Sequence, residues 1–377
     1  MTASSKRGCS LAGATLSSMA VSTLAAGLLM GCTTGIGPRA VRMQRGDYNA
    51  ALQQTNDQQL LVNIVRLRYA ETPSFLEVTG IVTQLQLELA TTLQAGTDAE
   101  KGAGGGVGAT FSYADQPTIT YLPSQGEQFV RRFLTPITPE TLLLLWESGW
   151  SFKRVARLSV QRLNRTANAP RASGPTPRRL ETSDDFAALM DKMAPLVRTG
   201  KLRFEIEEIA AAPTRRVVLR VVAGTDPEVR DAVRLLELAP GRDHYPLVTG
   251  VLHEASGPPW DSIYVQTRSL PSVLFFVSNG VEVPAEHSRA GVVTTAVSES
   301  GEAVDWAAIA GDMLRIRSSR SKPDQSRMAV RHRGHWFYID DTDVRSKSTF
   351  VLLTQLYAIQ ASPPSTGGPT LTLPVGR

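Results

Sequence analysis

Residues 84–90 read QLQLELA, and this strict alternation decides the fold of the first half of the chain. Successive residues of a β-strand point to opposite faces, so leucine at every second position predicts a strand with one apolar and one polar face. The stretch ATFSYADQPTITYLP at 109–123 alternates again, and the glycine-rich GAGGGVG at 102–108 lies between the two. The sequence therefore predicts one long β-hairpin between residues 78 and 121.

The predicted hairpin has two interpretations. An amphipathic hairpin usually buries its apolar face, and packing on helices of the same chain is the simpler expectation. However, strands of about 9 to 11 residues are long enough to cross an outer membrane. Hairpins from several copies would then join into one shared pore.

Apolar residues at helical spacing predict helices on both sides of the hairpin, namely 47–69, 126–134, 139–147 and 151–165. Asp47 is the expected N-cap of the first, and Thr72-Pro73 is expected to end it. These helices and the hairpin are expected to form a domain over residues 46–167. The stretch NAPRASGPTPRR, rich in proline, glycine and serine, predicts a solvated linker over 168–181.

The remainder alternates helical and strand patterns and predicts an α+β domain over residues 182–361, followed by a tail at 362–377. The stretches MLRIRSS, RMAVRHR and HWFYID, between residues 313 and 340, are expected to form a three-stranded meander. The predicted fold class is α+β: N-terminal helices with a long β-hairpin, then a C-terminal antiparallel sheet with packed helices.

Residues 1–31 have the pattern of a secretory signal. Lys6 and Arg7 form a basic start, residues 11–30 carry no charge, and the small Gly31 precedes Cys32. An uncut signal anchor of about 20 residues is the alternative. Cleavage would also remove Cys9, so the mature chain would hold one cysteine and no internal disulfide.

The sequence Leu29-Met30-Gly31-Cys32 resembles the lipobox of bacterial lipoproteins. The resemblance implies cleavage between Gly31 and Cys32 and acylation of Cys32, with residues 32–45 as a lipidated tether. Thr33, rather than aspartate, after the cysteine implies sorting to the outer membrane, facing the periplasm. LLVNIVRLRY, PTITYLPSQGEQF and HWFYIDDTDVRSKSTF resemble segments of bacterial lipoproteins that have no assigned function.

Charge is close to balanced, with 40 Lys and Arg against 35 Asp and Glu before the loss of Lys6 and Arg7. This argues against a nucleic-acid partner. Two basic runs, at 153–179 and 315–333, are either solvated surface or contacts for anionic lipid headgroups, lipopolysaccharide phosphate or an acidic partner protein. The candidate contacts are Arg154, Arg157, Arg165, Arg315, Arg317, Arg331 and Arg333.

The sequence contains few matches to catalytic or metal-binding motifs. G-x-S-x-G is absent, and the cluster Asp340, Asp341 and Asp343 is expected to cap the last helix rather than to cleave a glycosidic bond. His332 and His335 form H-x-x-H, but positions three apart on one strand face opposite ways. The sequence therefore predicts no catalytic residues, no metal and no cofactor.

The functional expectation that follows is a membrane-anchored periplasmic lipoprotein. Its most favoured role is a non-enzymatic scaffold, assembly or transport component of the cell envelope. A cell-wall or lipid hydrolase and a subunit of an oligomeric outer-membrane pore are the alternatives. The expected partners are the membrane, through the lipid anchor, and envelope proteins or anionic lipid, while the oligomeric state is left open.

Overall fold

The structure is a computed structural model. It describes residues 36–96, 104–124, 126–174, 179–180, 184–208, 215–250, 257–293, 297–298, 306, 313–324 and 326–361. The predicted signal sequence, Cys32 and the predicted C-terminal tail therefore lie outside the described residues. The chain divides into two compact units, residues 1–58 and 59–377, and the described part of the first unit is helical throughout.

The first described element is helix α2, Ile36–Arg68. It begins eleven residues before Asp47, so the N-cap prediction is wrong. Residues 36–45 of the predicted lipidated tether, 32–45, are helical. Its last turn carries Arg66 and Arg68, where cations suit the negative end of the helix dipole. The apolar residues of LLVNIVRLRY are buried in the second unit, except Val62, which is partly buried.

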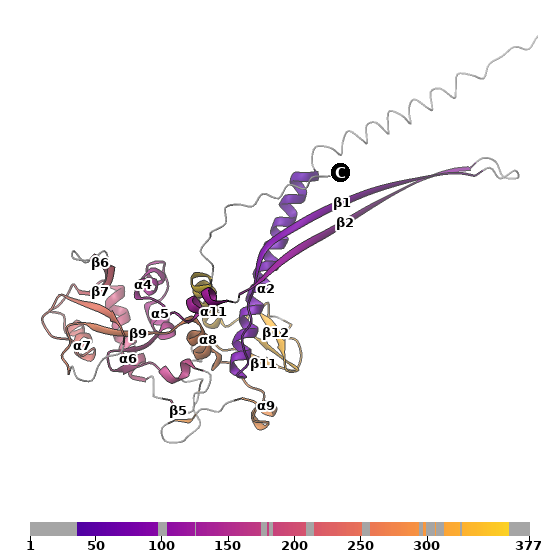
Figure 1. The fold of residues 1–377 in the computed structure, drawn as a ribbon. Helices are drawn as coiled ribbons and strands as arrows, with labels where there is room; N and C mark the ends of the chain where they lie inside the picture. Colours follow the sequence, from indigo (N-terminus) through magenta and orange to yellow (C-terminus); the bar gives the residue numbers. More distant parts are fainter. Residues whose placement is uncertain are drawn as a thin grey trace, which may run out of the picture. The chain divides into compact units, whose positions relative to one another are not determined.

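Strands β1 (Leu76–Gly96) and β2 (Gly104–Pro123) form the predicted hairpin, which the structure confirms (Figure 1). They pair antiparallel from Leu76–Pro123 to Gly96–Gly104, with one irregularity between Val78 and Gly80. The two form a sheet of their own and pair with no other strand of the described chain.

Helices α3 (Glu127–Leu134), α4 (Pro139–Glu147) and α5 (Phe152–Ser159) follow the hairpin. The Thr138 and Ser151 side chains cap α4 and α5 by accepting hydrogen bonds from backbone N–H groups. The sequence predicted a helix to Arg165, but Val160–Leu163 is strand β3. Pairing of β3 with a strand a hundred residues later overrides the helical pattern.

The largest sheet has six strands in the order β4-β3-β9-β8-β7-β6. The further bounds are β4 Thr166–Ala167, β6 Leu202–Glu208, β7 Arg215–Val221, β8 His244–Thr249 and β9 Ile263–Thr267. Its neighbouring strands are antiparallel except β8 and β9, which run parallel. The sheet is therefore mixed rather than wholly antiparallel.

This sheet also corrects the predicted domain boundary, because it combines strands from both sides of the expected linker at 168–181. Asn168, Ala169 and Ala172 are 1%, 0% and 0% exposed, and Pro170–Ser173 forms a short 3₁₀ helix, η1. The composition of this stretch is typical of a linker, but its small residues fit close packing and the Asn168 side chain donates to backbone carbonyls.

Helices α6 (Asp184–Arg198) and α7 (Pro227–Leu235) share one apolar core with the six-stranded sheet. A second, three-stranded sheet has the order β11-β13-β12, with bounds Arg317–Ser319, His335–Tyr338 and Ala329–His332. Both β11 and β12 pair with β13, so the expected meander order is wrong. β5 (Arg179–Leu180) and β10 (Val297–Ser298) form a short parallel pair. The α+β class and a C-terminal antiparallel sheet are confirmed.

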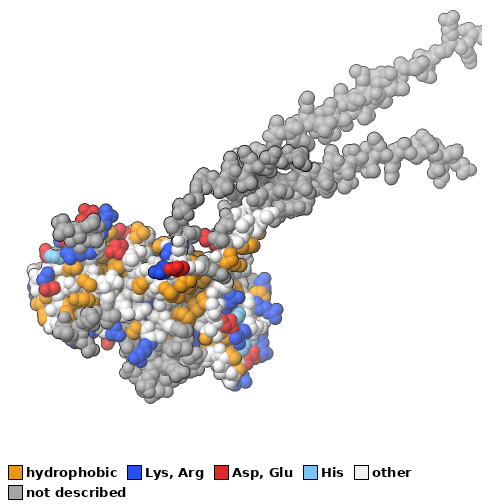
Figure 2. Space-filling model, viewed as in Figure 1, with side chains coloured by type: hydrophobic (Ala, Val, Ile, Leu, Met, Phe, Trp, Pro, Cys, Tyr) orange, Lys and Arg blue, Asp and Glu red, His pale blue; other side chains and the backbone are white. Residues whose placement is uncertain are grey.

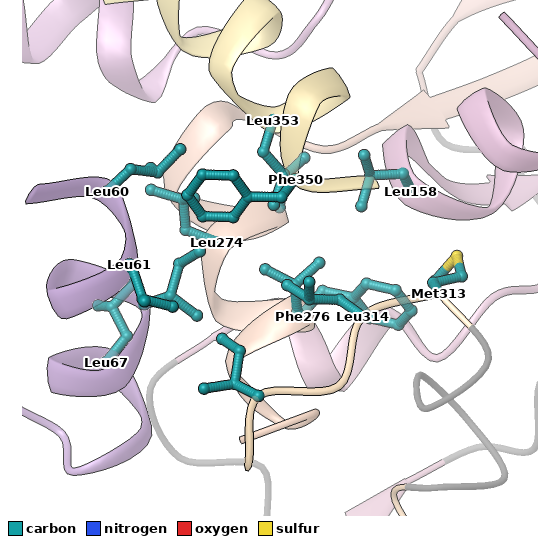
Figure 3. Close-up of a cluster of buried hydrophobic side chains, with 14 of the residues drawn as sticks. Leu60, Leu61, Leu67, Leu158, Leu274, Phe276, Met313, Leu314, Phe350 and Leu353 are labelled. Atoms are coloured by element: carbon teal, nitrogen blue, oxygen red, sulfur yellow. The ribbon is translucent and has the colours of Figure 1, made fainter. Parts of the chain in front are cut away.

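The main core of the second unit joins the end of α2 with α8 (Leu270–Ser278) and α11 (Val344–Ala361). Figure 3 shows Leu60, Leu61 and Leu67 of α2 facing Leu274 of α8 and Phe350 of α11. Among the described residues, no helix is sufficiently long and apolar to cross a bilayer.

In this core, the backbone at Gly280 lies very close to the backbone at Leu314. A Cβ at this position would lie 2.1 Å from the Leu314 carbonyl oxygen. We expect Gly280→Ala to lower the free energy of unfolding by about 2–3 kcal/mol through overpacking. Urea denaturation of the two proteins measures this, with Gly224→Ala as the control because its Cβ would meet a side chain at an ordinary 3.6 Å. Equal losses in both variants would contradict the prediction.

Candidate functional site

The register of the β1–β2 hairpin separates its residues into two faces. It pairs Leu87 with Tyr113 and Leu89 with Phe111, and alternate positions of a strand share a face. The positions on this first face are mainly apolar: Ile81, Leu85, Leu87, Leu89, Leu93, Val107, Ala109, Phe111, Tyr113 and Ile119, with Thr83, Thr91, Asp115 and Pro117 as exceptions.

The opposite positions of the same strands are polar or small, apart from Val82. They are Gln84, Gln86, Glu88, Ala90, Thr92 and Gln94 on β1, and Gly106, Gly108, Thr110, Ser112, Ala114, Gln116 and Thr118 on β2. We call the two sides the apolar face and the polar face of the hairpin. At the base of the apolar face, Ile119 is 40% exposed and Tyr121 is 54% exposed, so its end is open to solvent.

A second polar feature lies at the turn between β12 and β13. Arg333 and Gly334 have φ angles of 44° and 84°, the left-handed conformation of a two-residue hairpin turn. This turn makes His332 and His335 a directly opposed cross-strand pair. The expectation that they face opposite ways is therefore wrong, because i and i+3 across a two-residue turn are neighbours on one face.

Three of the five histidines of the chain gather here with Tyr69, which follows α2, and with α9 (Ala285–Arg289). Tyr69 Oη lies 2.7 Å from His287 Nδ1. Glu286 Oε1 lies 3.2 Å from His335 Nε2. Figure 2 shows acidic, basic and histidine side chains mixed over this part of the surface, at the lower right of the body. We call Glu286, His287 and His335 the histidine–glutamate cluster.

Arginines and burial set the electrostatics around the cluster. Arg320 lies 2.6 Å from the second carboxylate oxygen of Glu286, and this hydrogen bond holds the pKa of Glu286 below its usual range. Burial raises the pKa of Tyr69 to about 12, so its hydroxyl stays protonated at neutral pH. Burial also lowers the pKa of His332, whose Nε2 lies 3.2 Å from Glu71.

The candidate arginines of the first basic run lie in different surroundings. Arg157 is only 7% exposed, which leaves little of it available to headgroups. Arg165 is not on a helix with Arg154 and Arg157 but follows β3, where its guanidinium lies 5.4 Å from the Trp260 ring centre.

The second basic run is partly neutralised within the fold. Arg317 pairs with Asp340 at 3.1 Å and Arg333 pairs with Glu71 at 2.7 Å, while Arg315 and Arg331 are exposed. Contact of these arginines with anionic lipid stays a prediction.

The aspartates before α11 act as a helix cap. Asp343 accepts hydrogen bonds from the backbone N–H and the hydroxyl of Ser346 at 3.0 and 2.7 Å, as the sequence predicted. Asp340 accepts from Thr342 and pairs with Arg317. An apolar pocket of about 70 Å³ between α4, α5, α6 and the six-stranded sheet is lined by Trp146, Phe186 and other apolar residues, and its lining offers no acid–base pair.

No family model, no curated protein and no solved structure matches this chain. The functional argument therefore rests on the two features above, the hairpin and the histidine–glutamate cluster. Sequence reasoning missed the cluster because its members lie far apart in the chain. One signal was present for part of this site. Arg333-Gly334 lies between two strand patterns and predicts a two-residue turn, which would have placed His332 beside His335.

Proposed function

We propose that this protein is a lipid-anchored, non-enzymatic transport component of the outer membrane, a subunit of an oligomeric pore to which each copy contributes the β1–β2 hairpin. The observation that carries the proposal is the hairpin itself. Its strands have 21 and 20 residues, and both outer edges lack a partner strand within the described chain. One face is mainly apolar, with Asp115 among its exceptions, and the other is mainly polar or small.

The length and pattern of the hairpin support insertion into lipid. Twenty residues of strand extend about 65 Å, well beyond the roughly 30 Å of a hydrocarbon core. The leucine-rich section of β1 from Leu85 to Leu93 supplies nine positions, the number that a tilted spanning strand needs. Polar or small residues on the other face suit a water-filled interior.

The unpaired edges support an oligomer rather than a lone hairpin. In lipid, each unsatisfied backbone N–H or C=O costs several kcal/mol, so the outer edges of β1 and β2 need partner strands. Other copies of the same hairpin supply these partners if the strands close into a ring. Acylation of Cys32, which the lipobox resemblance implies, would hold the copies on one membrane and raise their local concentration.

The experiment uses the full-length chain expressed in a bacterium with an outer membrane. Mild detergent should extract a multimer that dissociates on heating, and its reconstitution into planar bilayers should give discrete conductance steps. Cys32→Ser should take up no radiolabelled palmitate and accumulate as uncut precursor. Wild-type protein that is monomeric in detergent and raises no conductance would contradict the pore, and continued palmitate labelling of Cys32→Ser would contradict the anchor.

A further inference from the structure

We propose that the histidine–glutamate cluster binds a divalent transition-metal ion, with Zn²⁺ as the best match to its donors. Glu286, His287 and His335 each offer one ligand atom, and the three atoms lie within 4.8 Å of one another. Two imidazole nitrogens and one carboxylate oxygen form a three-ligand zinc set whose fourth position is left to water. This site is separate from the hairpin and does not depend on the pore.

One pair of donors already has the spacing of a metal site. Zinc–ligand bonds of about 2.0–2.2 Å in a tetrahedral arrangement place neighbouring donors about 3.4 Å apart. Glu286 Oε1 and His335 Nε2 lie 3.2 Å apart. His287 adjoins Glu286 on α9, and its ring centre lies 5.0 Å from that of His335, so a small side-chain adjustment completes the set.

The surrounding hydrogen bonds orient two of the three ligands. Nδ1 of His287 lies 2.7 Å from Tyr69 Oη, and donation from Nδ1–H to that oxygen leaves the Nε2 lone pair for a metal. The second oxygen of Glu286 accepts from Arg320, which leaves Oε1 directed at His335. Metal-binding histidines and carboxylates usually have outer partners of this kind.

His335 is the most buried member of the cluster and is 7% exposed. Its Nδ1 is buried without a hydrogen-bond partner in the described structure, and an ion bound at Nε2 would not contact that atom. The spacing of the three donors and the outer partners of His287 and Glu286 therefore carry the proposal. The competing arrangement is an ordinary hydrogen bond between His335 and Glu286, beside the ion pair of Glu286 with Arg320.

A metal at this position would join α9 to the β12–β13 turn, and through Tyr69 to the end of α2. Each ligand comes from one of two segments that are about 50 residues apart in sequence, so the ion would act as a cross-link of the folded state. Metal binding to the folded state alone raises its stability in proportion to the logarithm of metal concentration over Kd.

The test uses full-length protein in detergent, without a histidine tag, stripped by a chelator and titrated with Zn²⁺ or Co²⁺. We expect one equivalent of Zn²⁺ by calorimetry, a rise in melting temperature, and the intense visible bands of tetrahedral Co²⁺. Glu286→Gln and His287→Asn should abolish the visible bands. Tyr69→Phe should weaken Zn²⁺ binding by roughly 10–100-fold, as loss of an outer partner usually does.

The matched control is His244→Gln. His244 lies on β8, away from the cluster, and its side chain is hydrogen-bonded to Asp243. This variant should bind Zn²⁺ like the wild type. The proposal is overturned if stripped wild-type protein shows neither tetrahedral Co²⁺ bands nor a Zn²⁺-dependent rise in melting temperature. It is also overturned if Glu286→Gln and His287→Asn bind as tightly as the wild type. Should either variant fail to fold, the difference between wild type and Tyr69→Phe decides.

Discussion

Replacing Leu87 with lysine should prevent pore assembly, whereas the same replacement at Gln86 should leave it intact. The two residues are adjacent, but register places Leu87 on the apolar face and Gln86 on the polar face. A lysine at a lipid-facing position near the membrane midplane costs about 2–4 kcal/mol in each copy, so the penalty multiplies over a ring. The heat-sensitive multimer and the conductance steps both measure the outcome.

Cysteine labelling gives a second readout at the same positions. The mature chain is expected to have one cysteine, Cys32, and the lipobox resemblance predicts that this cysteine is acylated. A cysteine introduced into the hairpin would then be the only free thiol. In membranes, a water-soluble maleimide should label Gln86→Cys and Glu88→Cys but not Leu87→Cys or Leu89→Cys. Labelling requires water at the thiol, so the alternation reports directly which face meets lipid.

Two results would contradict this account of the hairpin. Equal labelling of both faces would place the hairpin in water, and assembly of Leu87→Lys at wild-type levels would show that its apolar face does not meet lipid. Protection of the apolar face in a protein that stays monomeric would instead favour the simpler expectation, a hairpin covered within one chain or by a partner protein.

The second large effect is expected at Arg268, a fully buried side chain between β9 and α8. Its guanidinium donates to the carbonyl oxygens of Arg157, Leu158 and Val160 at 3.0, 3.0 and 2.9 Å, where α5 ends and β3 begins. It also lies 4.0 Å from the Phe276 ring centre. The last carbonyls of a helix lack partners within that helix, and this cation satisfies them at the favourable end of the dipole.

We expect Arg268→Met to lower the free energy of unfolding by about 3–5 kcal/mol, the usual loss when a buried charged network is broken. Methionine fills much of the volume but removes the guanidinium donor from the Leu158 carbonyl, whereas the carbonyls of Arg157 and Val160 keep the Asn168 amide as a donor. Urea denaturation measures the change, and the exposed Arg331→Met is the control that should change stability little. A loss below about 1 kcal/mol for Arg268→Met would contradict the assigned role.

The loss of unfolding free energy in Arg268→Met should be independent of pH around neutrality. Burial lowers the pKa of Arg268 from its usual range to about 9. Below pH 9 the guanidinium is therefore charged in both the folded and unfolded states. Above it the unfolded state binds more protons, so this group's contribution to stability rises with pH only in the alkaline range.

Local pattern was sufficient for several elements. The alternation of 84–90 and 109–123 specified the hairpin, and prolines and apolar spacing located α4 at the bounds that the structure shows. These elements follow from residues within one or two turns of each other, so a single sequence carries the information. The capping of α11 by Asp343 is equally local.

Long-range pairing decided what the pattern left open. Val160–Leu163 forms a strand because β9 is beside it, and the stretch at 168–174 is packed because its small residues contact the core. The spacing of apolar residues predicted a helix in the first case, and composition predicted a linker in the second. The sequence of each segment does not indicate the distant neighbour, which is β9 in the first case and the apolar core in the second.

By itself, the sequence determined the α+β class and the amphipathic hairpin, and it predicts the lipid anchor at Cys32. Only the tertiary structure decided that Arg268 is buried among carbonyls, and that Glu286, His287 and His335 meet around a tight turn. The physical reason is separation along the chain. Periodicity records which side of an element is apolar, whereas hydrogen bonds and ligand sets depend on which distant segments lie beside it.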